Sequence, residues 1–368
     1  MKKDLKIVLT GGGTAGHIMP ILYLAKLLKK SKNNQIYFIG VKQELAKELI
    51  SKFEIPYYSI YAGKMRRYFS FANLLSPFQF AIGFFQSLSI LRKIKPDLVF
   101  AKGGYVTVPV GMAAKFLKIK LLIHESDVKM GLSNKILAKF AVKIFTNFSV
   151  SYYPEKYHQK IVRVGIPVNP DFLKPIDQNI LASFGFSKKL PTILIFGGSL
   201  GAQNINFAVS KILSKLLQNY QVIHITGKLN YEKFLQRQKR LSKDLQKNYK
   251  VFDFLHSQMP KVLTSCDLVV CRAGANTLNE ISALGKPAIL IPLPSAASNH
   301  QLYNAKVFQR EKAAILIEES KLNSQKLFKT IRDLLKREFL LKTLGENAKK
   351  MYFPNSAEKI VEEIENSE

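Results

Sequence analysis

A glycine-rich loop near the N-terminus is the first feature that could do chemistry. Gly11, Gly13 and Gly16 have the spacing G-x-G-x-x-G, after an apolar run that predicts a strand and before a helix-like stretch. Such a loop presents backbone N–H groups at a helix N-terminus, where they bind anions such as a diphosphate. A nicotinamide dehydrogenase would also need an acidic residue ending the second strand, and no carboxylate precedes Glu44 there. The loop therefore favours a phosphorylated substrate.

His17 follows this loop, where the helix is predicted to begin. An imidazole with its ordinary pKa of about 6.5 can act as a general base at neutral pH. The positive end of a helix would lower that pKa and keep the ring neutral, as a base requires. The alternative is a histidine that only caps or packs the helix.

A second glycine loop lies in the other half of the chain. Gly197, Gly198 and Gly201 surround Ser199 after a predicted strand, so this backbone could also approach a diphosphate closely. Each half therefore carries a loop of the same kind.

Two charged residues further on could complete a nucleotide site. Arg272 follows a predicted strand and could neutralise a phosphate, with the backbone N–H groups of residues 273–276 as further donors. Glu280, in the helix that follows, could accept both hydroxyls of a ribose. The alternative for Glu280 is a carboxylate on a solvated helix face.

These loops need a scaffold, and strand and helix patterns alternate along the chain. The predicted strands cover residues 5–10, 36–39, 97–101, 120–124 and 143–146, and then 192–196, 221–226, 250–254, 268–271 and 288–292. This alternation is typical of parallel, doubly wound sheets, so we predict an α/β fold with two Rossmann-like domains. Prolines between residues 163 and 175 indicate a linker. The predicted domains are residues 1–165 and 190–345, joined by residues 166–189.

The composition limits the class of protein. The chain has 368 residues with 56 Lys and Arg against 26 Asp and Glu, a formal net charge of +30. This excess suits polyanions, although it could also be spread evenly over the surface. No nucleic-acid-binding motif is present, so no nucleic acid partner is expected. Cys266 and Cys271 fit neither a zinc site nor a disulfide framework, which suits a reducing cytosol, and no signal peptide is evident.

Residues 64–95 contain an aromatic stretch with basic residues at both ends. It is too short and too interrupted for a membrane span, which needs about 20 apolar residues. It could be a buried core helix, or it could insert partly into an anionic membrane surface. The residues that would enter the membrane are Phe69, Leu74, Leu75, Phe78, Phe84 and Phe85.

Six segments together resemble the MurG family of UDP-N-acetylglucosamine transferases, which complete the lipid-linked disaccharide precursor of peptidoglycan. They occur in the family order and cover nearly the whole chain: GGGTAGHIMP at 11–20, KGGYVTVP at 102–109, HESDVKMGLSNKILA at 124–138, FGGSLGAQNIN at 196–206, CRAGANTLNEI at 271–281 and NHQLYNA at 299–305.

The resemblance implies a GT-B fold, with two Rossmann-like domains facing a cleft and a C-terminal helix, residues 346–368, returning to the first domain. It implies inverting transfer of N-acetylglucosamine from UDP-N-acetylglucosamine to lipid I, a polyprenyl-diphosphate-linked acceptor, with no metal or other cofactor. It also implies a peripheral position on the cytoplasmic face of the cell membrane, with other cell-wall synthesis proteins as further partners.

The resemblance also assigns site residues. The catalytic candidates are His17 and Glu125. The donor side comprises Thr14, Gly16, Ser199, Phe254, Leu255, Arg272, Ala273, Gly274, Ala275, Glu280, His300 and Gln301, in which the Leu255 backbone meets uracil, Glu280 holds the ribose, and His300 and Gln301 bind the sugar. The acceptor side comprises Gly13, Tyr105, Asp127 and Asn169.

The chain departs from the family pattern on the acceptor side. Ser126 and Asp127 replace the usual Gln and Asn, and Ile166 and Asn169 stand where the family has Asn and Arg. Three alternatives stay open: a transferase for another lipid such as diacylglycerol, a UDP-sugar epimerase, and a noncatalytic relative that binds membrane or nucleic acid.

Overall fold

The computed structural model describes residues 4–12, 15–31, 33–42, 44–63, 76–174, 180–198, 201–296 and 299–367. The chain forms two compact units, Met1–Asn169 with Phe353–Glu368, and Pro170–Tyr352. The sequence placed the first boundary at residue 165 and the C-terminal return at residue 346. In the structure, residues 166–169 lie in the first unit, and residues 346–352 lie in the second.

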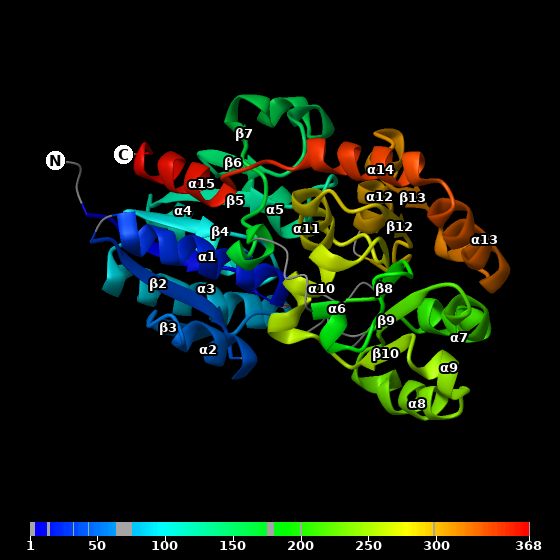
Figure 1. The fold of residues 1–368 in the computed structure, drawn as a ribbon. Helices are drawn as coiled ribbons and strands as arrows, with labels where there is room; N and C mark the ends of the chain where they lie inside the picture. Colours follow the sequence, from blue (N-terminus) through cyan, green and yellow to red (C-terminus); the bar gives the residue numbers. More distant parts are fainter. Residues whose placement is uncertain are drawn as a thin grey trace. The chain divides into compact units, whose positions relative to one another are not determined.

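The first unit contains a seven-stranded sheet in which every strand pair is parallel (Figure 1). Its order is β3-β2-β1-β4-β5-β6-β7, so the chain reverses direction along the sheet between β1 and β4. The strands are β1 (Lys6–Thr10), β2 (Gln35–Val41), β3 (Tyr57–Ile60), β4 (Leu98–Ala101), β5 (Lys120–Glu125), β6 (Lys143–Thr146) and β7 (Ile161–Arg163). The sequence predicted all of these except β3 and β7, which form the two edges.

Helices pack on this sheet and enclose a core of aliphatic side chains. They are α1 (Ala15–Ser31), α2 (Glu44–Ser51), α3 (Ser76–Ile94), α4 (Thr107–Phe116), α5 (Leu132–Leu137) and α15 (Ser356–Glu365), with 3-10 turns η2 (Val150–Tyr152) and η3 (Glu155–Lys160). Because β1 and β4 are central strands, their apolar residues are buried against α1 and α15, and Ile7 and Leu9 of β1 and Ile360 of α15 are fully buried.

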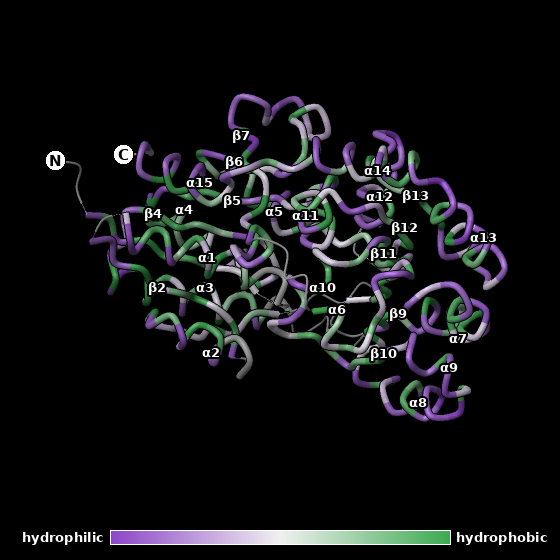
Figure 2. The backbone as a smooth tube through the Cα atoms, viewed as in Figure 1, coloured by the Kyte–Doolittle hydropathy of each residue, from purple (hydrophilic) through white to green (hydrophobic). Residues whose placement is uncertain are grey.

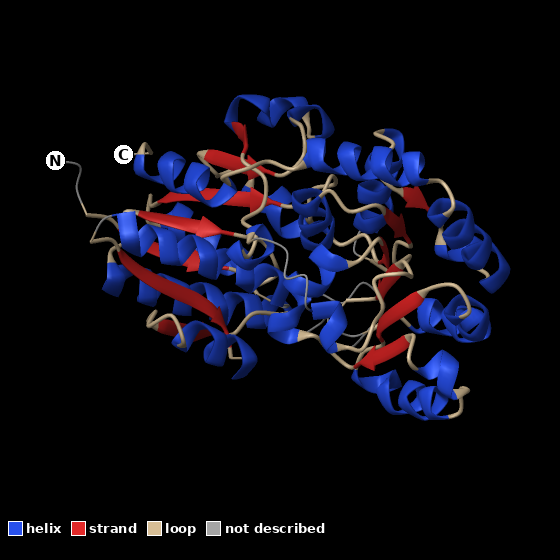
Figure 3. Cartoon of the chain, viewed as in Figure 1, coloured by secondary structure: helices blue, strands red, loops and turns tan. Residues whose placement is uncertain are grey.

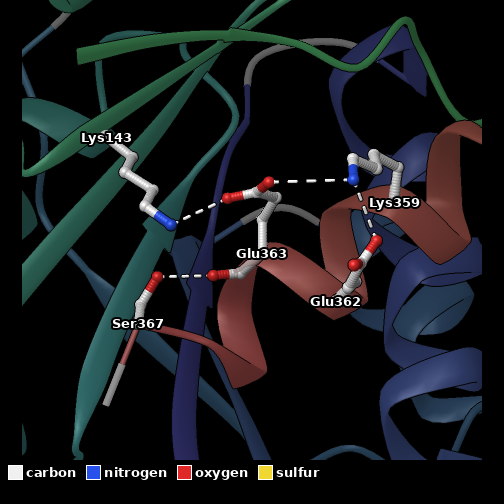
Figure 4. A network of polar contacts seen from close by, with 5 residues as sticks. All are labelled: Lys143, Lys359, Glu362, Glu363 and Ser367. Carbon is white, nitrogen blue, oxygen red and sulfur yellow. Dashed lines mark hydrogen bonds and ion pairs between the residues drawn. The ribbon is translucent and has the colours of Figure 1, made fainter. Parts of the chain in front are cut away.

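The C-terminal helix α15 is held to the first unit by charge as well as by its apolar face. The Glu363 carboxylate accepts from the Lys143 ammonium of β6 at 2.7 Å. Lys359 pairs with Glu362 at 3.0 Å and lies 3.9 Å from Glu363, while the Ser367 hydroxyl donates to the Glu363 carbonyl (Figure 4). The predicted return of the C-terminal helix to the first domain is therefore confirmed.

The second unit repeats the plan with a six-stranded sheet in the order β10-β9-β8-β11-β12-β13, again with every pair parallel. Its strands are β8 (Thr192–Phe196), β9 (Gln221–Ile225), β10 (Tyr249–Phe252), β11 (Leu268–Cys271), β12 (Ala288–Leu290) and β13 (Ile315–Leu316). The reversal falls between β8 and β11, the counterpart of the reversal in the first unit. The short edge strand β13 was not predicted.

Helices cover both faces of this sheet too (Figure 3). They are α6 (Ile180–Ser183), α7 (Gln203–Leu217), α8 (Lys228–Lys239), α9 (Lys243–Gln246), α10 (Met259–Ser265), α11 (Ala275–Leu284), α12 (His300–Arg310), α13 (Ser324–Leu335) and α14 (Glu338–Met351), with 3-10 turns η4 (Pro170–Leu173), η5 (His256–Gln258) and η7 (Glu319–Lys321). Helices α8 and α13 carry mainly hydrophilic residues (Figure 2). The predicted α/β fold with two Rossmann-like domains is confirmed.

Candidate active site

The candidate residues of the first unit follow strands β1, β4 and β5, at the carboxyl edge of the sheet. The strand order reverses between β1 and β4, and the carboxyl edge at such a reversal is the usual ligand site of open α/β sheets. The loops begin at Gly11, Lys102 and Ser126.

Two of these loops touch through glycines. Gly104 has φ +92°, and a Cβ there would lie 2.3 Å from the carbonyl oxygen of Gly12. The Lys102 N–H donates to the Thr10 carbonyl at 2.9 Å, which continues the β1–β4 pairing into the loops. The missing side chains therefore let the loops after β1 and β4 meet at the carboxyl edge of the sheet.

The catalytic candidate His17 lies in the first turn of α1, directly after this contact. The structure describes the backbone of Gly16 and His17 but not the side chain of His17. Gly13 and Thr14 lie outside the described residues. The backbone thus brings His17 to the predicted edge, and its role as a base stays a prediction.

The second catalytic candidate, Glu125, is buried at the end of β5 and holds its own loop together. Its carboxylate accepts from the backbone N–H groups of Asp127 at 3.0 Å and Gly131 at 2.8 Å, and from the Asn134 amide at 2.9 Å. Burial, followed by the nearby Asp127 charge, raises the pKa of Glu125, while these hydrogen bonds oppose the rise. The geometry therefore gives Glu125 a task in fixing residues 125–134, and its catalytic role stays a prediction.

The remaining acceptor-side candidates lie on the same loops. Tyr105 follows Gly104 and is partly buried, which raises its pKa. The Asp127 carbonyl accepts from the Tyr153 hydroxyl at 3.0 Å. Asn169 ends the first of the two segments of the first unit, and Ile166, three residues earlier, is buried.

In the second unit the candidates follow β8, β11 and β12. Gly198 has φ +93° and Gly201 has φ +77°, and a Cβ at Gly201 would lie 2.3 Å from the Thr226 carbonyl oxygen. This loop therefore reaches the end of β9 by close backbone approach. Ser199, its predicted diphosphate ligand, lies outside the described residues.

The loop after β11 leads into the N-terminus of α11. Gly274 is the N-cap, with φ −70° and ψ 141°, and a Cβ there would meet no described atom within 4 Å. The Ala273 carbonyl accepts from the Asn304 amide at 3.2 Å, which fixes the loop against α12. There is therefore space beside Gly274 at the N-terminus of α11, which begins at Ala275, and a helix N-terminus suits a phosphate.

Glu280 lies in the second turn of α11 and is partly buried. Its carboxylate has no hydrogen bond or ion pair within the part of the chain that the structure describes. Burial raises its pKa to about 8. An uncompensated carboxylate of this kind is suited to accept hydrogen bonds from a diol.

Arg272 is engaged differently from the prediction. Its guanidinium pairs with Glu319 at 2.5 Å and donates to the carbonyls of Ile291 at 3.0 Å and Pro292 at 3.3 Å. These contacts join β11 to the loop after β12 and to η7. The predicted contact of Arg272 with a diphosphate stays a prediction, and the structure adds this internal pairing.

The other donor-side candidates surround the same edge of the second sheet. The Leu255 carbonyl accepts from the N–H groups of Gln258 and Met259, and the neighbouring Phe254 is 43% exposed. His300 begins α12, and the Gln301 side-chain oxygen accepts from the Leu293 N–H at 3.0 Å.

Comparison with known proteins identifies the family. Residues 7–146 match the glycosyltransferase family 28 N-terminal domain, and residues 192–362 match its C-terminal domain. The chain is 40% identical to a UDP-N-acetylglucosamine--N-acetylmuramyl-(pentapeptide) pyrophosphoryl-undecaprenol N-acetylglucosamine transferase of Bacillus cereus, over 96% of this chain and 99% of that protein. The chain belongs to the MurG family.

Other relatives agree with this MurG assignment. A transferase of the same name from Clostridium perfringens is 41% identical over 91% of each chain. The crystal structure of Acinetobacter baumannii MurG matches with a TM-score of 0.77 and 27% identity, over 99% of this chain and 100% of that one. The structure of a Neisseria meningitidis UDP-GlcNAc 2-epimerase shares the fold, with a TM-score of 0.70 and 15% identity, over 99% of this chain and 100% of that one. The predicted GT-B fold and the predicted family are confirmed.

The sequence analysis did not assign a role to Lys102, a buried residue that follows β4 at the carboxyl edge of the first sheet. The side chain of Lys102 is 3% exposed, and its ammonium donates to the Ser126 hydroxyl. The sequence could have indicated that Lys102 is buried, because a lysine between a buried strand and two glycines is not in a usual position for a solvated cation.

We expect Gly104→Ala to destabilise the protein strongly and to abolish activity. The new methyl group would add a clash with the Gly12 carbonyl to the cost of a positive φ, which is about 1–2 kcal/mol for alanine. Gly185→Ala is the matched control, since Gly185 has φ +74° but no atom within 4 Å of its Cβ position. Urea unfolding of both variants measures the difference; equal losses would show that the loops do not need the close approach.

Proposed function

We propose that this protein transfers N-acetylglucosamine from UDP-N-acetylglucosamine to lipid I, undecaprenyl-diphospho-N-acetylmuramyl-pentapeptide, and so forms lipid II for peptidoglycan synthesis. The observation that carries this function is 40% identity, over nearly the full length, to a transferase named for that reaction. The geometry of the second unit supports it, because an open helix N-terminus and an uncompensated carboxylate lie on one helix.

The reaction proceeds by attack of an acceptor hydroxyl on C1 of the donor sugar, with inversion, while UDP leaves. The diphosphate lies at the N-terminus of α11, where the helix dipole and the N–H groups of the first turn stabilise the charge that develops on UDP. The Glu280 carboxylate accepts hydrogen bonds from the two ribose hydroxyls. His17 takes the proton of the attacking hydroxyl. This scheme uses no metal ion.

The test is UDP release from UDP-N-acetylglucosamine by the purified protein, with and without a short-chain lipid I analogue. Release that requires the analogue and yields the disaccharide supports the function. Release with diacylglycerol alone would identify a different lipid acceptor, an epimer formed without acceptor would identify an isomerase, and binding without any release would identify a noncatalytic relative.

Donor binding should depend on pH through Glu280. Hydrogen bonds from the ribose favour the ionised carboxylate, so UDP binding must remove the proton that the free protein holds below a pKa of about 8. About one carboxyl in ten is ionised at pH 7, so we expect UDP affinity to rise about tenfold between pH 7 and pH 9. Calorimetry of the wild type and Glu280→Gln measures this slope.

The slope should disappear in Glu280→Gln, and also in the wild type when the ligand is 2′,3′-dideoxy-UDP, which lacks the diol. The same slope in the glutamine variant would mean that another group controls the pH dependence and that Glu280 does not hold the ribose.

We further propose that the first unit binds the cytoplasmic face of the membrane through α3 and the end of α4. Phe78, Ile82 and Phe85 lie on one face of α3, at i, i+4 and i+7, and are 70%, 49% and 66% exposed. Phe116 is 64% exposed and packs edge-on against Phe84 at 6.2 Å. A group of exposed aromatic side chains of this kind marks an interaction surface.

Basic residues and helix length fit a surface position. Arg92 and Lys93, in the last turn of α3, are exposed and suit anionic lipid headgroups. In the described part of the chain, no helix is long and apolar enough to cross a bilayer. Of the residues predicted to enter the membrane, Phe84 is half-buried, whereas Phe69, Leu74 and Leu75 lie outside the described residues.

We expect Phe78→Ser with Phe85→Ser to weaken binding to phosphatidylglycerol-containing vesicles by about tenfold or more, because each phenyl ring contributes roughly 1.5–3 kcal/mol when buried. The control is Phe207→Ser with Phe339→Ser, two aromatic residues of the second unit that are 61% and 85% exposed. Vesicle sedimentation measures both; equal binding by the two double variants would remove α3 from the membrane surface.

A further inference from the structure

Lys102 is a buried cation with few hydrogen-bond acceptors among the described residues. It directly follows β4, and its side chain is 3% exposed. Its ammonium donates to the Ser126 hydroxyl, and this is the only hydrogen bond that it makes in the described part of the chain. An ammonium has three N–H donors, so two of them have no acceptor there.

The group that receives the Lys102 hydrogen bond does not neutralise its charge. The Ser126 oxygen lies 3.5 Å from Nδ1 of His124, and Nε2 of His124 donates to the Gly165 carbonyl at 2.7 Å. In this arrangement His124 carries its proton on Nε2, and each donor points away from the ammonium towards Gly165. These contacts lead from the ammonium to the Gly165 carbonyl.

The nearest carboxylates compensate the charge only in part. The described residues place no carboxylate within ion-pair distance of Lys102, and Glu125 already accepts three hydrogen bonds from its own loop. Burial lowers the pKa of Lys102 to about 8, against the opposing charges of Glu125 and Asp127. Burying an ammonium with so few partners is costly, so its retention points to a ligand that supplies the missing acceptors.

The position of Lys102 indicates which ligand. It stands where the sheet reverses, and its Cβ is 3.4 Å from the position that a Cβ on Gly11 would occupy. The N-termini of α1 and α4 follow the two glycine loops at this point. Two helix N-termini with a buried ammonium between their loops favour a doubly charged, phosphate-containing group.

We propose that Lys102 binds a phosphate oxygen of the acceptor diphosphate through its two remaining N–H groups, with Ser126 holding the ammonium in place. This inference rests on the proposed function, in which the acceptor carries a diphosphate. It makes Lys102 and Ser126 a pair that recognises the acceptor and not the donor.

The test compares Lys102→Met with the wild type in steady-state kinetics with UDP-N-acetylglucosamine and a short-chain lipid I analogue. A hydrogen-bonded charge contributes about 1.5–3 kcal/mol, so we expect the KM for the analogue to rise about ten- to a hundredfold while the KM for UDP-N-acetylglucosamine stays the same. Lys26→Met, which removes an exposed lysine of α1, is the control and should change neither constant.

An unchanged KM for the analogue would overturn the inference, and so would a rise confined to the KM for UDP-N-acetylglucosamine, because the phosphate would then be that of the donor. Thermal unfolding of Lys102→Met separates binding from folding. Methionine removes a poorly paired buried charge, so Tm should stay the same or rise.

A second measurement needs neither the variant nor turnover. Inorganic pyrophosphate, added to wild-type protein saturated with UDP, should raise Tm at pH 7, and this increase should shrink above pH 8 as Lys102 loses its proton. A pyrophosphate effect that is independent of pH would contradict the inference. Absence of transfer by the wild type in the kinetic experiment, with this pH-dependent effect intact, would instead contradict the proposed function.

Discussion

The contact between Gly104 and the Gly12 carbonyl is the constraint on which the ligand edge of the first unit depends. A side chain at residue 104 would lie 2.3 Å from that oxygen, so only glycine lets the loops after β1 and β4 meet. Their contact brings the first turn of α1, with His17, to the same place as Lys102 and Tyr105. In the second unit, Gly201 approaches the Thr226 carbonyl in the same way. In each unit, close backbone approach brings the loops of separate strands to one edge.

At the carboxyl edge of each sheet, one charged residue is hydrogen-bonded within the protein and a second residue of opposite charge has few partners among the described residues. The second residue is a cation in the first unit and a carboxylate in the second. In the first unit Glu125 accepts from three donors, whereas the Lys102 ammonium has a single acceptor among the described residues. In the second unit Arg272 is paired with Glu319, whereas Glu280 has no partner in the described part of the chain. The occupied groups stabilise their loops, and the under-compensated groups are suited to ligands. A cation suits a diphosphate and a carboxylate suits a diol, so the two edges differ in the part of a substrate that they can recognise.

The sequence predicted the parts of this structure that depend on local pattern. Central strands such as β1 and β8 are short apolar runs that end at glycine loops, and both were predicted within a residue. The edge strands β3, β7 and β13 were missed because short, partly exposed strands lack that pattern. Pairings between distant residues were also out of reach: Arg272 meets Glu319, 47 residues away, and Lys102 meets Ser126, 24 residues away. Residue type alone assigned Arg272 to a phosphate, and only the fold shows what its guanidinium already holds.

The same distinction bears on the residues that depart from the MurG pattern. Asp127 contributes to its loop through its backbone, since its N–H donates to Glu125 and its carbonyl accepts from Tyr153. A change of side chain at residue 127 therefore leaves these contacts intact. Ser126 contributes through its side chain instead, because its hydroxyl accepts a hydrogen bond from the Lys102 ammonium. A noncatalytic relative would have no reason to keep a buried ammonium in such an arrangement, because an apolar side chain of the same length would be more stable there. The residues that differ from the MurG pattern therefore favour a protein that still binds an anionic acceptor, through a changed set of polar contacts, over one that has lost acceptor binding.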